Sequence, residues 1–256
     1  MRGLKGKTAI VTGSGSGIGR AIAKRLALEG MTVGVFDINP AGAAETVATI
    51  EAEGGRAIAA ACDITDYAAV TAAVRQFEGG TGEGTYLLVN NAGWDMPIPF
   101  IKTDEAFWKK VTAINWFGPL HMTHAVATGM AERKAGRIVN IASDAGRVGS
   151  TGEAVYSGCK GATIAFAKTL ARELARSNVL VNTICPGPTD TPVLAAFAGS
   201  GEQGQKIRDA LVRSVPLGRV GQPDDYPGLV AFLASDDAAY ITGQTISVSG
   251  GLTMHG

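Results

Sequence analysis

Cysteine is scarce in this chain of 256 residues, and the three cysteines, Cys62, Cys159 and Cys185, lie far apart without a CxxC pair. This spacing excludes a disulfide framework and provides no thiolate cluster, so we expect no metal site. His121 and His124 lack a third ligand at suitable spacing and are assigned to packing or surface roles. Free, widely spaced thiols suit a reducing compartment, so the predicted location is the cytoplasm.

The chain also lacks an excess of charge of either sign, because 23 basic residues balance 23 acidic ones. No global field therefore draws the protein to nucleic acid or to an anionic membrane. No apolar run approaches the roughly 20 residues that span a bilayer. The first apolar segment, Thr8 to Thr12, begins too near the N-terminus to leave room for a signal peptide. The expected partners are a small molecule and further copies of the chain.

What the sequence does contain is a regular alternation of strand-like and helix-like segments. The expected strands are 8–11, 32–36, 57–61, 86–90, 136–141, 180–184 and 245–248, and the expected helical regions are 18–29, 41–52, 67–77, 104–130 and 154–175. Several strands are apolar without alternation, as expected when both faces of a sheet are covered. Parallel strands need helical crossovers of this kind. We therefore predict an α/β fold, with residues 1–256 forming a single doubly wound Rossmann-type domain.

A glycine-rich loop joins the first predicted strand to the first predicted helix. Its sequence from residue 12 is TGSGSGIG, and the residues expected to bind a cofactor are Gly13, Ser16, Gly17, Ile18 and Gly19. Glycines allow positive φ and close backbone approach, and the helix N-terminus offers free N–H groups to a pyrophosphate. Glycine at such a turn can be merely structural. Its place after the first strand of a strand–helix–strand unit favours dinucleotide binding.

Asp37 closes the second predicted strand, about 20 residues after the glycine loop, where a carboxylate accepts hydrogen bonds from ribose hydroxyls. An aspartate at a strand end can also be only a turn residue. Facing the ribose, it would repel a 2′-phosphate, and neither Ser16 nor Ile38 supplies a cation to offset this repulsion. The predicted cofactor is therefore NAD rather than NADP.

Tyr156 and Lys160 stand four positions apart on a predicted helix and therefore share one face. A free phenol has a pKa of about 10, too high for an efficient base near neutrality. A cation about 4 Å away lowers that pKa by about 1 to 3 units. Such a pair can also be a surface pair. Ser143 favours a catalytic role for the pair, because it follows the strand 136–141 at the sheet edge where ligands bind. A serine at this position can also be only a turn residue.

Together these segments resemble the classical short-chain dehydrogenase/reductase family over essentially the whole chain. The matching pieces are TGSGSGIG at 12–19, Asp63, NNAG at 90–93, Asn115, Ser143, the Tyr156 and Lys160 pair, and PGPTDT at 186–191. The resemblance implies a seven-stranded parallel sheet with its active site at the carboxyl ends of the strands. It also implies that Ser143 holds the substrate oxygen, Tyr156 exchanges the proton, and Asn115 joins a water-linked relay ending at Lys160. The alternative for Asn115 is a solvent-facing or capping amide.

The resemblance extends to the remaining cofactor contacts. It places Asp63 and Ile64 near the adenine, Asn90, Ala92 and Gly93 along the cofactor ribose, and Pro186, Gly187, Thr189 and Thr191 around the nicotinamide half, with Tyr156 and Lys160 also touching the cofactor. Asn90 has an alternative role, which is to pin neighbouring strands. Residues that flank the catalytic positions are expected to include the substrate wall: Trp94, Asp95, Met96, Asp144, Arg147, Val148 and Glu153.

The implied reaction interconverts a secondary alcohol and a ketone. The overall pattern is most similar to NAD-dependent dehydrogenases of hydroxyacyl-CoA thioesters, and the expected substrate is 2-hydroxycyclohexanecarboxyl-CoA, an intermediate of anaerobic aromatic-acid degradation. The segment around 187–215 is the predicted substrate lid. Lys206, Arg208 and Arg213 either meet the CoA phosphates or form a solvated helix face.

Two other functions stay open. One is a 3-oxoacyl-thioester (acyl-carrier-protein) reductase. Such reductases usually prefer NADPH, and the acidic Asp37 counts against this function. The other is a non-catalytic dinucleotide-binding sensor. The resemblance also implies a homotetramer in which the helical regions 104–130 and 154–175 pair between subunits and the segment 252–256 lies near another interface.

Overall fold

Seven parallel strands form one sheet in the order β3-β2-β1-β4-β5-β6-β7 in the computed structural model, which describes residues 1–192, 194–195, 199 and 201–254. The strands are β1 (Thr8–Thr12), β2 (Thr32–Asp37), β3 (Arg56–Ala61), β4 (Leu87–Asn90), β5 (Gly136–Ile141), β6 (Val179–Pro186) and β7 (Thr245–Val248). Because the chain order reverses between β1 and β4, a topological switch point lies at their carboxyl ends. The predicted single α/β domain with seven parallel strands is confirmed.

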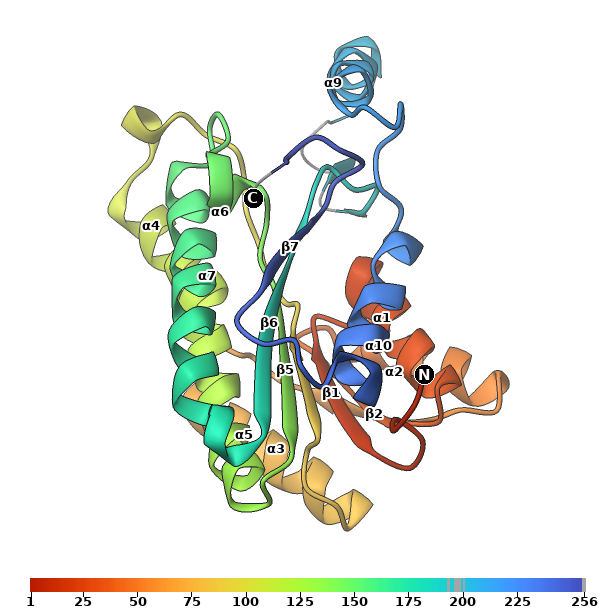
Figure 1. Ribbon diagram of the computed structural model, residues 1–256. Helices are drawn as coiled ribbons and strands as arrows, with labels where there is room; N and C mark the ends of the chain where they lie inside the picture. Colours follow the sequence, from red (N-terminus) through yellow and green to blue (C-terminus); the bar gives the residue numbers. More distant parts are fainter. Residues whose placement is uncertain (193, 196–198, 200, 255–256) are drawn as a thin grey trace.

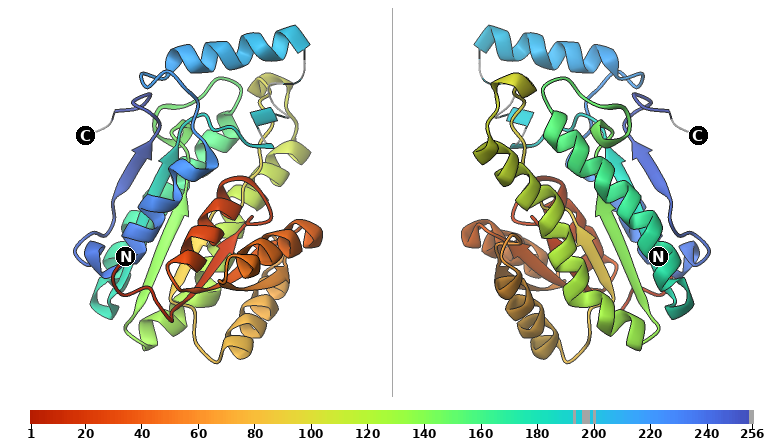
Figure 2. Two further views of the ribbon diagram at one scale, coloured as in Figure 1. Left: turned by 90° about the vertical axis from the view of Figure 1, so that its right-hand side faces the viewer. Right: turned by 90° about the vertical axis from the view of Figure 1, so that its left-hand side faces the viewer.

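Helices cover both faces of this sheet (Figure 1). One face carries α1 (Gly17–Leu28), α2 (Pro40–Ala52) and α10 (Pro227–Ala234), and the other carries α3 (Tyr67–Thr81), α5 (Gly118–Glu132) and α7 (Ala154–Leu174). Further α-helices in the described residues are α4 (Glu105–Thr112), α6 (Ala145–Val148) and α9 (Gly201–Ser214), and short turns are η1 (Phe100–Lys102), η3 (Ala175–Ser177), η4 (Pro223–Asp225) and η5 (Asp236–Ala238). Figure 2 shows α9 lying across the end of the molecule toward which the strands point.

Successive side chains of each strand point to opposite faces and supply two separate cores. In β1, Val11 packs in the core beneath α1 and α10, whereas its neighbour Ile10 packs in the core beneath α3, α5 and α7. In β4, Val89 packs in the core beneath α1 and α10, and Leu88 packs in the core beneath α3, α5 and α7. This two-sided burial is why the central strands are apolar at nearly every position.

The long helical region predicted for 104–130 is interrupted by a π-helical turn, η2 (Ala113–Phe117), between α4 and α5. Pro119 has no N–H, so the carbonyl of Asn115 cannot receive the usual α-helical hydrogen bond from it. The N–H of Gly118 instead reaches back to the carbonyl of Ala113. π-turns of this kind often occur at functional sites, and this one contains Asn115.

We expect Leu88→Ala to lower the free energy of unfolding by about 2–5 kcal/mol, because Leu88 is 0% exposed and no neighbour can refill the space. Leu28→Ala is the matched control, since Leu28 is 63% exposed at the end of α1 and should change stability by about 0.5 kcal/mol or less. Urea denaturation measures both variants. Equal losses would contradict the assignment of β4 to the centre of the sheet.

Candidate active site

The glycine loop between β1 and α1 has room for a ligand but none for side chains of its own. Gly13 has a φ of +63°, and a Cβ there would lie 2.8 Å from the Cα of Ala92. At Gly19, a Cβ would come within 2.2 Å of the carbonyl oxygen of Gly13. The side chain of Ser16 makes no capping bond and the first turn of α1 has no acidic residue, so its N–H groups are available to an anion. These features fit the pyrophosphate of a dinucleotide.

Asp37 lies at the end of β2 and is held against this loop. One carboxylate oxygen accepts a hydrogen bond from the N–H of Gly15 at 2.8 Å, and the other accepts one from the N–H of Asn39 at 2.8 Å. Arg20, which the sequence analysis did not single out, also contacts the carbonyl of Gly15, but it is paired with Glu45 at 2.8 Å. Because Glu45 neutralises Arg20, the negative charge of Asp37 dominates this edge of the loop.

Thr12 and Asn91 fasten the carboxyl end of β4 to the glycine loop, and neither was a predicted site residue. The hydroxyl of Thr12 accepts hydrogen bonds from the N–H groups of Asn91 and Ala92, both at 3.0 Å. The side-chain amide of Asn91 donates to the carbonyls of Thr12 at 2.9 Å and Gly13 at 3.1 Å. A polar residue ending each of two neighbouring parallel strands is the sequence signal that could have indicated this link.

Two of the predicted cofactor residues use their side chains within the protein. Asn90 is 4% exposed and donates to Asn140 at 2.9 Å and Thr123 at 3.0 Å, which is the strand-pinning alternative. Thr189 is 7% exposed and its hydroxyl pairs with that of Tyr226. The amide nitrogen of Asn90 and the hydroxyl of Thr189 are thus occupied within the protein.

The other predicted cofactor residues lie along the same sheet edge. Thr191 packs beside the glycine loop, since a Cβ on Gly17 would lie 3.6 Å from its methyl group. Pro186 ends β6, and the N–H of Gly187 bonds to the carbonyl of Val248 at 3.2 Å. Beyond β3, Asp63 is exposed and accepts from the N–H of Thr65 at 2.9 Å, whereas Ile64 is buried.

Lys160 is buried at the centre of the predicted catalytic set. It is 4% exposed, and its ammonium donates to the carbonyl of Ile141, at the end of β5, at 3.1 Å. Burial lowers the pKa of Lys160 to about 8. With this pKa, Lys160 remains largely protonated near neutrality. A Cβ on Gly93 would lie 3.4 Å from Lys160 Nζ and 2.9 Å from Asn115 Oδ1, so glycine is required between them.

Asn115 is 0% exposed, which excludes the solvent-facing alternative. Its amide nitrogen donates to the carbonyl of Trp94 at 2.6 Å and to that of Val111 at 3.0 Å, and its oxygen accepts from the N–H of Trp94 at 3.3 Å. The π-turn thus turns Asn115 inward, where it fixes the loop that follows β4.

Tyr156 lies near this lysine, with Lys160 Nζ 5.4 Å from the centre of its ring. Burial raises the pKa of Tyr156 above its ordinary value, and the charge of Glu153 raises it further, while a hydrogen bond with Ser143 opposes both effects. The hydroxyl of Ser143 also accepts from the N–H of Ala145 at 3.1 Å. The structure therefore brings Ser143, Tyr156 and Lys160 together, with the phenol protonated at neutral pH.

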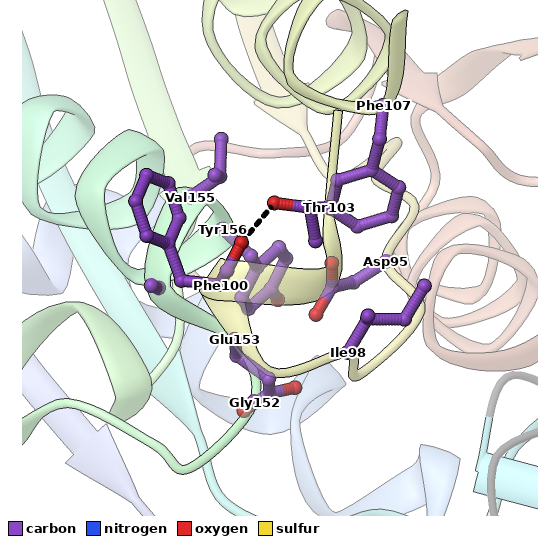
Figure 3. Close-up of a pocket in the computed structure, with 10 residues that line it drawn as sticks. Asp95, Ile98, Phe100, Thr103, Phe107, Gly152, Glu153, Val155 and Tyr156 are labelled. Carbon is purple, nitrogen blue, oxygen red and sulfur yellow. Dashed lines mark hydrogen bonds between the residues drawn. The ribbon is translucent and has the colours of Figure 1, made fainter. Parts of the chain in front are cut away.

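A narrow pocket, too small in this structure to hold a water molecule, lies beside Tyr156 (Figure 3). Its walls come from the segment after β4, from η1 and α4, and from the start of α7. The lining residues are Asp95, Ile98, Phe100, Thr103, Phe107, Gly152, Glu153, Ala154, Val155 and Tyr156. Of the residues expected in the substrate wall, Asp144 and Arg147 instead bond to Ser247 of β7.

The other reactive side chains have ordinary structural surroundings. Burial raises the pKa of the Cys159 thiol, so it is not a thiolate nucleophile. His121 Nδ1 lies 2.9 Å from the carbonyl of Ile64, and His124 Nδ1 lies 2.7 Å from the hydroxyl of Tyr67. Among the described residues, no three His, Cys, Asp or Glu side chains are grouped to hold a metal, and no described helix is both long and apolar enough to cross a membrane.

A parallel sheet with a glycine loop at its switch point and a Ser, Tyr and Lys set beside it defines the class, a dinucleotide-binding oxidoreductase. The family described as enoyl-(acyl carrier protein) reductase matches residues 13–253. The chain belongs to the short-chain dehydrogenase/reductase family.

Individual relatives match along nearly their whole length. The (3R)-3-hydroxyacyl-CoA dehydrogenase of Homo sapiens is 35% identical, covering 98% of this chain and 97% of the relative. The (2S)-[(R)-hydroxy(phenyl)methyl]succinyl-CoA dehydrogenase subunit of Thauera aromatica is 36% identical, covering 98% of both chains. Among solved structures, a 3-oxoacyl-[acyl-carrier protein] reductase with bound NAD from Brucella melitensis superposes with a TM-score of 0.89 at 33% identity, covering 98% of this chain and 92% of that one.

We expect Gly19→Ala to weaken NADH binding at least about tenfold, equivalent to about 1.4 kcal/mol, because the added methyl group collides with the Gly13 carbonyl. Gly79→Ala in α3 is the control, since a Cβ there meets nothing within 4 Å. Fluorescence titration measures binding, and circular dichroism checks that both variants fold. Wild-type affinity in folded Gly19→Ala would contradict the placement of the cofactor on this loop.

Proposed function

We propose that this protein is an NAD-dependent dehydrogenase that interconverts a secondary alcohol and a ketone on a hydroxyacyl-CoA thioester. The observation that carries the proposal is the convergence of Ser143, Tyr156 and buried Lys160 at the sheet edge that also presents the glycine loop. Asp37 supports NAD, because its carboxylate would repel a 2′-phosphate. Relatives that are named as dehydrogenases of hydroxylated acyl-CoA compounds support the substrate class.

In this proposal the glycine loop, Asp37, Asp63, Ile64 and the segments after β4 and β6 hold the dinucleotide. NAD, when bound, supplies the hydride acceptor and a positive charge. Ser143 donates a hydrogen bond to the reacting oxygen. During oxidation Tyr156 takes the hydroxyl proton, and during reduction it returns a proton to the carbonyl oxygen.

Lys160 stabilises the ionised form of Tyr156, because a buried ammonium acts on the phenolate with little screening by water. Asn115 and Lys160 flank Gly93, as a proton relay between them requires. The neutral phenol that the unliganded site favours is the form that reduction needs. Oxidation needs the phenolate, which positive charge in the site favours.

The pocket beside Tyr156 supports a compact cyclic acyl group, of which 2-hydroxycyclohexanecarboxyl-CoA is our specific proposal. Ile98, Phe100 and Phe107 provide apolar walls of suitable chemistry for an alicyclic ring. The segment around 187–215 serves as the lid in this proposal; its residues 193, 196–198 and 200 lie outside the described residues, and its helix α9 lies across the end of the molecule toward which the strands point (Figure 2). Lys206 and Arg208 have protein partners, Glu202 at 3.3 Å and Asp190 at 3.2 Å, which supports their assignment to a solvated face. We also propose the homotetramer described above.

A 3-oxoacyl-(acyl carrier protein) reductase is the second candidate. The reductase from Brucella melitensis holds NAD, so a preference for NAD does not by itself separate the two functions. Turnover of a CoA thioester against the same acyl group on a carrier protein separates them.

The test is a panel of secondary alcohols and hydroxyacyl-CoA thioesters, assayed with NAD and with NADP by the absorbance of the reduced cofactor. We expect turnover of CoA thioesters with NAD and much weaker turnover with NADP. Tyr156→Phe should lose turnover by at least about 100-fold, because the proton acceptor is gone, while NADH binding persists.

Turnover in Tyr156→Phe at the wild-type rate would contradict the mechanism. Activity on free alcohols without activity on any CoA thioester would overturn the substrate class and leave the mechanism standing. Tight NADH binding without turnover of any substrate would instead favour the non-catalytic sensor.

A further inference from the structure

Two carboxyl groups lie close together in the wall of the proposed substrate pocket, and the mechanism above uses neither. Asp95 belongs to the segment after β4, and Glu153 precedes α7, three residues before Tyr156. Both line the pocket together with Tyr156, as Figure 3 shows. A substrate whose alcohol reaches Tyr156 therefore places its neighbouring atoms beside these carboxyl groups.

Neither carboxyl group has a cation partner in the part of the chain that the structure describes. Asp95 Oδ2 is buried without any hydrogen-bond partner there, which is costly unless a ligand or a proton satisfies it. Burial raises the pKa of Asp95 and the charge of Glu153 raises it further, while Lys160 opposes them. With one shared proton on Asp95 and the negative charge on Glu153, the pair can present one hydrogen-bond donor and one negative charge to a substrate.

We propose that Asp95 and Glu153 select substrates whose second polar group is an uncharged acyl carbonyl, as in a thioester, and reject the free carboxylate of the same acid. This inference rests on the proposed function. A protonated carboxyl group donates a hydrogen bond to a carbonyl oxygen, and it satisfies the unpartnered atom. A free carboxylate in the same position meets a like charge in a poorly hydrated pocket.

The apolar walls favour this class over a cationic one. Ile98, Phe100 and Phe107 surround the pair with hydrocarbon, in which a thioester carbonyl is easily desolvated and an ammonium group is not. The pair would thus ensure that the acid is oxidised only after it has been activated as a thioester, so a reaction that forms the thioester must precede this one.

The test compares three probes: the N-acetylcysteamine thioester of 2-hydroxycyclohexanecarboxylic acid, the free acid, and cyclohexanol. The small thioester removes the phosphates of CoA from the comparison. Each kcat/KM is divided by that for cyclohexanol, which has no second polar group, so a general loss of turnover cancels. The variants are Asp95→Asn and Glu153→Gln, with Glu51→Gln on the exposed side of α2 as the matched control.

We expect the wild type and Glu51→Gln to prefer the thioester over the free acid strongly. Glu153→Gln should reduce that preference by about tenfold or more, because it removes the like charge that opposes the acid, whereas Asp95→Asn leaves that charge in place and should reduce the preference less. Infrared difference spectra at neutral pH should also show a protonated carboxyl group in the wild type that is lost in Asp95→Asn.

An unchanged ratio in both variants would overturn the inference, and so would preference of the wild type for a 2-amino alcohol, which would assign the pair to ammonium recognition. The absence of a protonated carboxyl band would overturn the shared proton independently of turnover. Failure of the wild type to oxidise cyclohexanol or either acyl probe with NAD would instead count against the proposed function itself.

Discussion

The site depends on one buried cation, the ammonium of Lys160, held by the carbonyl of Ile141 at the carboxyl end of β5. An ammonium with 4% exposure is stable only where backbone dipoles or opposite charges compensate for lost hydration. The strand end supplies the dipole, and α7 brings the lysine to it. Two neighbours are arranged beside this group: Gly93, where a Cβ would collide with Asn115 Oδ1 at 2.9 Å, and Asn115, which fixes the loop on which Gly93 lies.

The same burial explains the chemistry of the neighbours. Desolvation disfavours every charged form, so it raises the pKa of Tyr156 and of Asp95 and lowers that of Lys160. At Tyr156 the hydrogen bond with Ser143 acts against this rise. A pocket of this kind keeps acids neutral until a ligand alters the local charge, and this is the condition under which one phenol can serve both directions of a reversible reaction.

Much of the fold could be predicted from the sequence, because its signals are local. Apolar strands, glycine at the first turn and Asp37 at the end of the second strand each indicate their structure within a short window. The π-turn at Ala113–Phe117 could not be predicted, since a helix pattern continues through it and only Pro119 disturbs it. Asp95 and Glu153 were both expected in the substrate wall and both line the pocket, but their proximity to each other could not be predicted, because the two segments meet only after the sheet and α7 are assembled.

Side-chain direction was the other limit on prediction. Asn90 and Thr189 lie at the expected sheet edge, yet the amide nitrogen of Asn90 bonds to Asn140 and the hydroxyl of Thr189 bonds to Tyr226 on neighbouring elements. A one-dimensional pattern places a residue at an edge without saying which way it points. By contrast, the set of Ser143, Tyr156 and Lys160 could be predicted because a helical spacing of four and a strand end constrain both position and direction.

The most direct test of the central claim is the pH dependence of kcat/KM for alcohol oxidation in Lys160→Met, which removes the cation and keeps a side chain of similar length. The account predicts a loss of at least about 100-fold near pH 7 that partly recovers as pH rises, because the phenol of Tyr156 then ionises without help. A folded Lys160→Met protein with near-wild-type kcat/KM and an unchanged pH profile would contradict it.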